Sequence, residues 1–164
     1  MRTALPLLAL AGAVAVLLIG CGGTSSHGGP LHGRVVRVVD GDTIKVRLDD
    51  GRTERVRYIG VDTPESVKPD TPVQCFAERA SEFNAKLVEG KTVRLDQDVD
   101  ARDRYGRLLA YVHAGGVFVN AELVRRGYAR PLTVPPNVRY ADRFARLASQ
   151  ARERGTGLWS ACSS

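Results

Sequence analysis

The sequence has few of the residues from which several common functional sites are built. Its 164 residues include only three cysteines and three histidines, and the histidines are scattered at positions 27, 32 and 113. It contains no internal repeat, no zinc-finger cysteine spacing and no glycine-rich loop of the kind that cradles phosphates. These absences argue against a repeat protein, a zinc finger and a nucleotide-binding loop.

The one long hydrophobic run lies at the N-terminus. Residues 1–20 carry a single basic residue, Arg2, before an apolar stretch that stops abruptly at Cys21. This is typical of an export signal, with a membrane-spanning helix as the alternative. The letters LIGC resemble a bacterial lipobox, which implies a lipidated Cys21 that anchors an exported chain to the extracytoplasmic face of a bacterial membrane. We therefore expect a lipoprotein signal over 1–20, lipidated Cys21 and a Gly/Ser-rich linker over 21–32, and one domain over 33–164.

Charge and the two remaining cysteines fit an exported domain. The formal net charge of the chain is +6, and a basic exported domain attracts polyanions such as nucleic acid, acidic glycan or lipid headgroups. After export Cys75 and Cys162 would lie in an oxidising compartment. A disulfide between them would stabilise the fold by about 4 kcal/mol in the chain-entropy model; two buried free thiols are the alternative.

Alternating apolar and charged residues predict an antiparallel meander of three strands at 36–39, 44–48 and 56–58. The first two flank Asp40-Gly41-Asp42, which is a strong hairpin signal, so these acids are either turn residues or ion ligands. Two more strands are expected near 92–95 and 108–112, with a short segment at 117–119.

Three helices complete the pattern. Thr71, Pro72 and Gln74 read as a capping box that opens the first helix, which ends at Gly90. Asn120 is expected to cap a second, brief helix that stops at Gly127. A third helix over 138–154 would have two distinct faces. Its apolar face would hold Val138, Ala141, Ala145 and Ala148, and its solvated basic stripe Arg139, Arg143 and Arg146.

Five strands with a helix between the third and fourth predict an α+β fold. The layout matches a five-stranded Greek-key barrel of the oligonucleotide/oligosaccharide-binding (OB) type, decorated by three α-helices. Barrels of this type bind polyanions on an exposed strand face.

Two motifs bring together side chains suited to phosphodiester cleavage. VRYIGVDTPES places Arg57, Asp62 and Glu65 within one strand end and one turn, and RDRYGRLLAY delivers Arg107 at the start of a strand. Cleavage needs a positioned water, a held phosphate and neutralised phosphoryl charge. Asp42 and Asp62 suit a hard cation, Glu65 suits the water, and the arginines suit phosphate oxygens. A capped turn and a structural ion-pair network are the alternatives.

Four segments in this order, VVDGDTIKV, RYIGVDTPE, DRYGRLLAYV and VNAELVRRGYA, resemble the staphylococcal nuclease (thermonuclease) family. The resemblance covers residues 33–159. It implies a five-stranded barrel with three helices, dependence on Ca2+, and hydrolysis of DNA and RNA that leaves 3′-phosphate ends.

The resemblance also assigns roles to individual residues. Arg57, Glu65 and Arg107 match catalytic positions, while Asp42, Asp62 and the carbonyl of Thr63 match metal ligands. Four more positions follow from it: Asp40 and Thr43 in the outer shell of the metal, and Arg104 and Tyr105 at substrate phosphate. The family's tyrosines that pack against the nucleotide are absent, since Thr133 and Pro135 stand in that neighbourhood.

The sequence thus predicts a monomeric, lipid-anchored, Ca2+-dependent nuclease acting on DNA, RNA or both. A non-catalytic barrel that binds nucleic acid or protein is the main alternative, and a structural lipoprotein of the envelope is a third. Retention of all five charged residues of the two motifs and the hairpin favours the enzyme.

Overall fold

A computed structural model of the chain describes residues 29–65 and 72–162. The predicted export signal, Cys21 and Thr71 lie outside the described residues. The elements follow in the order β1 (Leu31–Val38), β2 (Thr43–Leu48), β3 (Thr53–Tyr58), β4 (Val61–Asp62), α1 (Ala77–Val88), β5 (Thr92–Asp96), β6 (Leu108–Ala114), β7 (Val117–Phe118), α2 (Val119–Arg125), β8 (Arg130–Pro131), α3 (Ala141–Glu153) and α4 (Leu158–Ala161).

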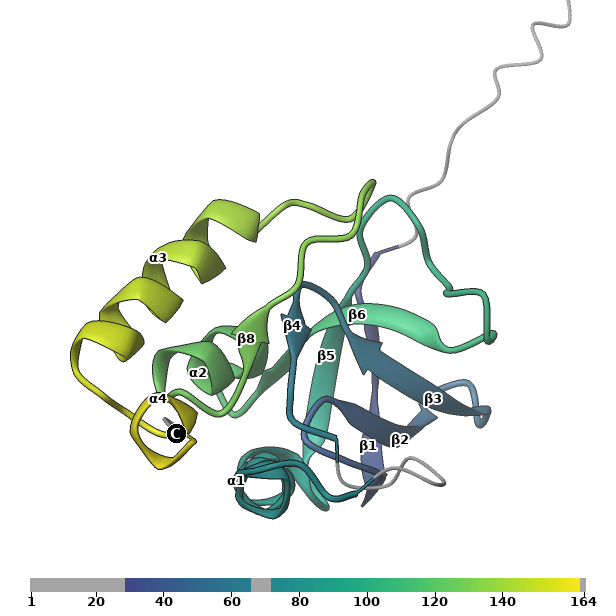
Figure 1. Ribbon diagram of the computed structural model, residues 1–164. Helices are drawn as coiled ribbons and strands as arrows, with labels where there is room; N and C mark the ends of the chain where they lie inside the picture. Colours follow the sequence, from purple (N-terminus) through teal and green to yellow (C-terminus); the bar gives the residue numbers. More distant parts are fainter. Residues whose placement is uncertain (1–28, 66–71, 163–164) are drawn as a thin grey trace, which may run out of the picture.

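Five of the strands close into a barrel (Figure 1). β1 pairs antiparallel with β2 and with β5, β2 continues into β3, and β5 continues into β6. The barrel closes where β3 runs parallel to β6, with Val56 opposite Leu108 and Tyr58 opposite Ala110. The predicted α+β fold with a five-stranded OB-type barrel is therefore confirmed.

Alternation along the strands builds the core. In β2, Ile44, Val46 and Leu48 are buried, whereas Lys45 and Arg47 between them are exposed, as the two-residue period of a strand requires. Buried side chains from all five barrel strands meet in one hydrophobic core inside the barrel. The charged residues at the intervening positions are left on the outside.

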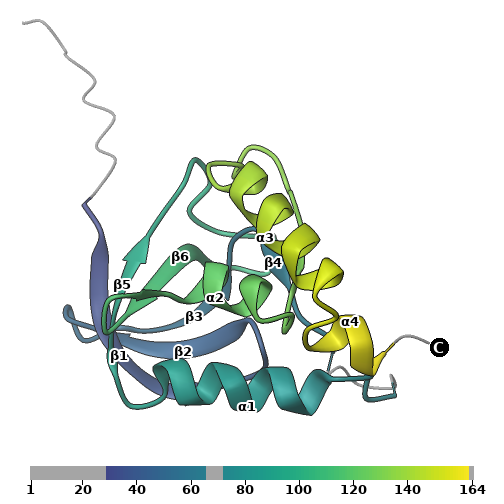
Figure 2. The same ribbon diagram turned by 90° about the vertical axis from the view of Figure 1, so that its left-hand side faces the viewer.

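The helices cover two sides of the barrel (Figures 1 and 2). α1 packs against β1, α2 packs against β6 and α3, and the short β4–β8 pair lies between the barrel and α3. α4 is a four-residue helix beyond the three that were predicted. Among the helices of the described residues, none has the length and hydrophobicity that crossing a bilayer requires.

The predicted start of the first helix is wrong. α1 begins at Ala77, after Phe76 adopts a left-handed φ of 71°, and residues 72–74 are not helical. Gln74 does not close a capping box, because it pairs with the backbone of Glu65 instead. A tertiary contact therefore replaces the local capping interaction that the sequence pattern indicates. β1 also begins at Leu31, two residues before the predicted domain boundary.

Two further helix predictions need correction. Asn120 lies inside α2 and is fully buried: its Oδ1 accepts a bond from Val112 N and its Nδ2 donates to Ile59 O, both at 2.9 Å. α3 begins at Ala141, and its buried face consists of Phe144, Ala148 and Ala151. Of the predicted face, Ala148 is buried as expected, whereas Ala145 is exposed and Val138 precedes the helix, with 44% of its surface exposed.

Candidate active site

The turn between β1 and β2 presents two aspartates at one end of the barrel. The backbone N of Asp42 donates to Asp40 Oδ1 at 3.0 Å, so Asp40 shapes the turn. Gly41 between them lies against Thr63, and a Cβ there would meet Thr63 Oγ1 at 2.6 Å. Only glycine lets this turn approach the Thr63 segment so closely.

Asp42 is buried and accepts hydrogen bonds on both carboxylate oxygens. Its Oδ2 accepts hydrogen bonds from Thr63 N at 2.8 Å and from Thr63 Oγ1 at 2.9 Å. Its Oδ1 accepts a bond from Thr43 Oγ1 at 3.2 Å and lies 3.2 Å from Arg57 Nε. Asp42 therefore joins the start of β2, the end of β3 and the segment after β4. The structure thus brings Thr43 and Thr63, two of the predicted site residues, to this carboxylate.

Arg57 stands between the two aspartates that were predicted to bind metal. Its Nη1 donates to the carbonyls of Tyr58 at 2.9 Å and Val61 at 2.8 Å, and its Nη2 lies 3.0 Å from Asp62 Oδ1. Only 14% of the Arg57 side chain is exposed, against 57% of the Asp62 side chain. Asp42 and Asp62 thus share one guanidinium, and the Asp62 carboxylate reaches solvent.

Negative charge is concentrated around this guanidinium. Burial, and then the charge of Asp42, raise the pKa of Asp40 to about 6. Burial also raises the pKa of Asp62; Arg57 opposes this shift, while Asp42 and Glu65 add to it. A nearby cation would favour the ionised form of these carboxylates.

The donor set fits calcium, which prefers hard oxygen ligands. Asp42, Asp62 and the carbonyl of Thr63 provide such oxygens. In the part of the chain that the structure describes, no three His, Cys, Asp or Glu side chains form a complete metal site. An ion here would therefore take its remaining oxygens from water and from substrate phosphate, as an ion that acts on a substrate must.

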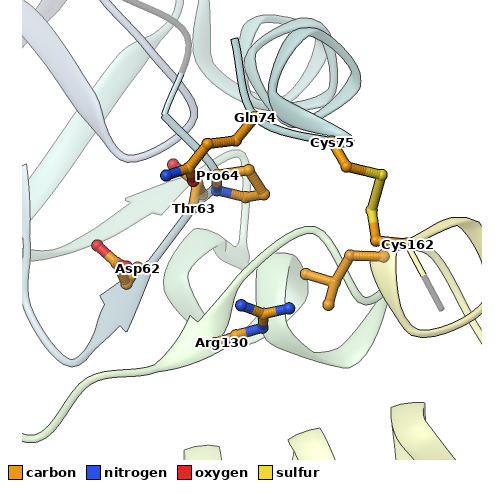
Figure 3. A pocket seen from close by; sticks show the side chains of 8 residues that line it. Asp62, Thr63, Pro64, Gln74, Cys75, Arg130 and Cys162 are labelled. Carbon is orange, nitrogen blue, oxygen red and sulfur yellow. A yellow bond between two sulfur atoms is a disulfide. The ribbon is translucent and has the colours of Figure 1, made fainter. Parts of the chain in front are cut away.

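Glu65 follows Pro64 and is half-buried, and its backbone is held on both sides. Glu65 N donates to Gln74 Oε1 at 2.9 Å, and Gln74 N donates to Glu65 O at 3.0 Å. Cys75, which follows Gln74, forms a disulfide with Cys162 near the end of the described chain (Figure 3). The position of Glu65 therefore depends on Gln74. Sequence reasoning missed that role because nothing local to Gln74 indicates a partner nine residues earlier.

Arg107 is positioned by an aspartate turn. Asp103 Oδ1 accepts bonds from the backbone N of Tyr105 and of Arg107, both at 2.9 Å, and Asp103 Oδ2 lies 2.7 Å from Arg107 Nε. Arg104 Nη2 donates to Tyr105 Oη at 2.6 Å. The role of Asp103 was also missed, although an aspartate that accepts backbone bonds two residues later is a known turn signal.

A cleft of about 560 Å³ lies beside this turn, and Asp42, Asp62 and Glu65 are not among the residues that line it. Arg57 and Arg107 both contribute to its wall, with Arg104 and Tyr105 beside them. Leu132, Val134 and Pro135 form an apolar wall where the resemblance would place tyrosines. A smaller hollow of about 280 Å³ lies next to Asp62, between Gln74, Arg130 and the disulfide (Figure 3).

The arrangement is both an ion-pair network and a site suited to phosphate chemistry. Arg57 touches Asp42 and Asp62 on one side and lines the cleft that holds Arg107 on the other. Glu65 lies close enough to Asp62 to affect its pKa. The five charged residues singled out from the sequence thus lie around one end of the barrel.

Comparison with known proteins agrees with this geometry. Residues 55–161 match the family model described as Staphylococcal nuclease homologue. The chain is 44% identical over 127 residues to "Thermonuclease" of Staphylococcus hyicus, covering 77% of this chain and 75% of that protein. It is also 44% identical over 126 residues to "Endonuclease YncB" of Bacillus subtilis, covering 76% and 59%. The chain therefore belongs to the staphylococcal nuclease family.

Proposed function

We propose that the chain is a Ca2+-dependent nuclease that hydrolyses DNA, RNA or both and leaves 3′-phosphate ends. The nuclease activity itself, with nucleic acid as substrate, follows from family membership and from relatives named thermonuclease and endonuclease. One observation supports the finer proposal above all: Arg57 is held between Asp42 and Asp62 at the edge of a cleft that also contains Arg107.

Asp42, Asp62 and the Thr63 carbonyl would hold the ion. When bound, Ca2+ supplies positive charge to a phosphoryl oxygen and a site for water. The two aspartates already meet at Arg57. Burial raises the pKa of Asp62, Arg57 lowers it, and the charges of Asp42 and Glu65 raise it further. Asp40 and Thr43 would keep Asp42 in place through the bonds to its backbone N and its Oδ1.

Glu65 would orient the attacking water or accept its proton. A carboxylate in this role must be fixed relative to the phosphate, and the double contact with Gln74 fixes the Glu65 backbone. The proton leaves the water as the new bond to phosphorus forms. Cleavage between phosphorus and the 5′ oxygen would then leave the phosphate on the 3′ side, and the departing 5′ oxygen would take a proton from solvent to become a hydroxyl.

Arg57 and Arg107 would stabilise the negative charge that grows on the phosphoryl oxygens. Each guanidinium offers forked donors that stay charged at every physiological pH. Arg107 is held by Asp103, so its donors are positioned before substrate arrives. Arg104 and Tyr105, exposed on the same cleft, would contact a neighbouring phosphate.

The test uses the purified full chain with radiolabelled single- and double-stranded DNA and RNA. We expect cleavage with Ca2+, none with a chelator, and 3′-phosphate ends. Glu65→Gln should lower kcat by at least about a hundredfold, the lower end for loss of a general base, with unchanged substrate affinity. Glu82→Gln, at an exposed position of α1, is the matched control and should cleave normally. Cleavage that survives both the chelator and Glu65→Gln would refute this mechanism.

We propose further that the protein is an exported, monomeric lipoprotein anchored through Cys21. The apolar run over 1–20, the letters LIGC and the flexible composition after them support the anchor. The site is assembled from residues of one chain, which is consistent with a monomer. In a bacterial host, incorporation of labelled fatty acid into the wild type but not into Cys21→Ser would support lipidation; equal labelling would contradict it. Light scattering tests the monomer.

A further inference from the structure

Five basic side chains cover the outer face of β1, β2 and β3. We call this surface the basic face; it consists of Arg34, Arg37, Lys45, Arg47 and Arg55, and all five are exposed. β2 and β3 alternate, so Val46 and Val56 point into the core, as does Val35 in β1. A bulge in β1 between Val35 and Arg37 places Arg37 opposite Lys45 and so on the same side as Arg34. The face is therefore a product of strand geometry and not of a disordered loop.

The register places these charges directly opposite one another. Arg34 faces Arg47 across β1 and β2, and Lys45 faces Arg37 on one side and Arg55 on the other. Like charges in directly opposite positions destabilise a sheet. Within residues 29–65 and 72–162, none of the five forms an ion pair with a carboxylate, whereas arginines such as Arg102, Arg125 and Arg139 do.

The basic face continues to the active site. In β3, Arg57 lies two residues beyond Arg55 and so points to the same side of the sheet, and its partner across the ladder is Thr43 at the start of β2. From Arg57 to Thr53 the strand rises by about 13 Å. That length corresponds to roughly four nucleotides at the 3.4 Å spacing of phosphates along one DNA strand.

We propose that the basic face binds the phosphate backbone of a nucleic-acid strand beyond the phosphate that is cut. This inference rests on the proposed function, because the strand is the substrate of the same active site. Uncompensated positive charge in register with Arg57 favours a linear polyanion that also enters the cleft. The contacts are to phosphates, so they add affinity for long strands without preference for sequence.

The test compares long and short substrates with the full chain. The variant Arg34→Gln/Arg47→Gln/Arg55→Gln removes three charges from the basic face. The control Lys86→Gln/Arg146→Gln/Arg154→Gln removes three exposed charges from α1, α3 and the end of α3. Both triple variants have the same net charge, so a difference in KM between them shows an effect of where the charges lie. Circular dichroism melting should show that the basic-face variant is at least as stable as the wild type, since repulsion is relieved.

We expect the basic-face variant to raise KM for a 20-nucleotide single strand about tenfold with kcat unchanged. Cleavage of a dinucleotide should be unaffected, and the control should change KM less than twofold. For the long strand, a plot of log affinity against log salt concentration has a negative slope, and its magnitude should fall by about 2. Each phosphate that is no longer neutralised accounts for about 0.7, and the variant removes three positive charges. Equal changes in the two triple variants would overturn the proposal, since net charge alone would then explain them.

Two further measurements separate this inference from its alternatives. If the variant loses binding to phosphatidylglycerol vesicles while KM for the long strand is unchanged, the basic face is a membrane contact and the proposal is wrong. Fluorescence anisotropy of the labelled 20-nucleotide strand with chelator measures binding without cleavage. Should the wild type cleave nothing, the proposed function fails, but a tenfold affinity difference in anisotropy would still support the binding face and an unchanged affinity would overturn it.

Discussion

Removing the Cys75–Cys162 disulfide should destabilise the protein strongly. The bridge joins residues 87 apart in sequence, and the chain-entropy relation for a loop of this length gives about 4.5 kcal/mol at 25 °C. Domains of this size have total stabilities of roughly 5–15 kcal/mol. The double substitution Cys75→Ser/Cys162→Ser should therefore remove a large part of the free energy of unfolding.

Urea unfolding followed by circular dichroism measures the effect. We compare the oxidised wild type, the double serine variant and the wild type treated with dithiothreitol. The two forms without the bridge should unfold at similar, much lower urea concentrations, and the reductant should not change the serine variant further. The serine variant treated with dithiothreitol is therefore the control for effects of the reductant elsewhere in the protein.

The same variant tests how the bridge supports Glu65. Cys75 follows Gln74, whose side chain and backbone hold the Glu65 backbone. After correction for the folded fraction, we expect a lower kcat in the serine variant and little change in KM. A variant within about 1 kcal/mol of the wild type would refute the loop-entropy reasoning, and an unchanged kcat would refute the positional link to Glu65.

Three other perturbations have defined outcomes. Tyr58→Phe removes the 2.9 Å bond to Asn84 Oδ1 in the core and should lower the free energy of unfolding by about 1–3 kcal/mol, measured in urea; no change would contradict it. Burial, as the largest cause, raises the pKa of Asp40 to about 6 in the folded protein, whereas the unfolded value is about 4. Because the folded state holds this proton more tightly, the free energy of unfolding of the calcium-free protein should fall by up to about 3 kcal/mol as the pH rises from about 4 to about 6. Asp40→Asn should flatten that pH profile, and a persisting slope would assign it to another group. Gly60→Ala places a Cβ 2.6 Å from the Phe144 ring at a φ of 78° and should lower the melting temperature, whereas an unchanged value would show that the ring yields.

The strands were predictable because their signal is local. Alternation in TIKVRL, residues 43–48, fixes both the strand and its buried face. The parallel closure of Val56 against Leu108 could not be read this way, since it pairs segments about fifty residues apart with no periodic signal of their pairing. The sequence supported a barrel only through the order of strands and helix and the family resemblance.

The helix errors have the same origin. Pro72 and Gln74 carry a valid local capping pattern, but in the folded protein Gln74 forms hydrogen bonds with the Glu65 backbone instead. In α3 the small Ala145 fits an apolar stripe, yet the bulky Phe144 determines which side enters the core. Local patterns identify an element more reliably than its first residue or its buried face.

The site was predictable where its residues are neighbours in sequence. Arg57, Asp62 and Glu65 lie within nine positions, so a strand end and a turn suffice to bring them together. The contact of Asp42 with Thr63 depends on the folded barrel, and the support from Gln74 depends on a partner across a loop. Supporting residues of this kind carry no chemistry that marks them in a sequence.

The four contacts of Arg57 affect how substitutions there should be interpreted. Its guanidinium fastens two backbone carbonyls, of Tyr58 and Val61, as well as two carboxylates. Replacing it would loosen the corner that carries Asp62 in addition to removing a positive charge, so a fall in turnover would mix two defects that kinetics alone cannot separate. Arg107 forms an ion pair with a single carboxylate, Asp103. A substitution of Arg107 therefore gives a cleaner measure of what one guanidinium contributes to bond breaking.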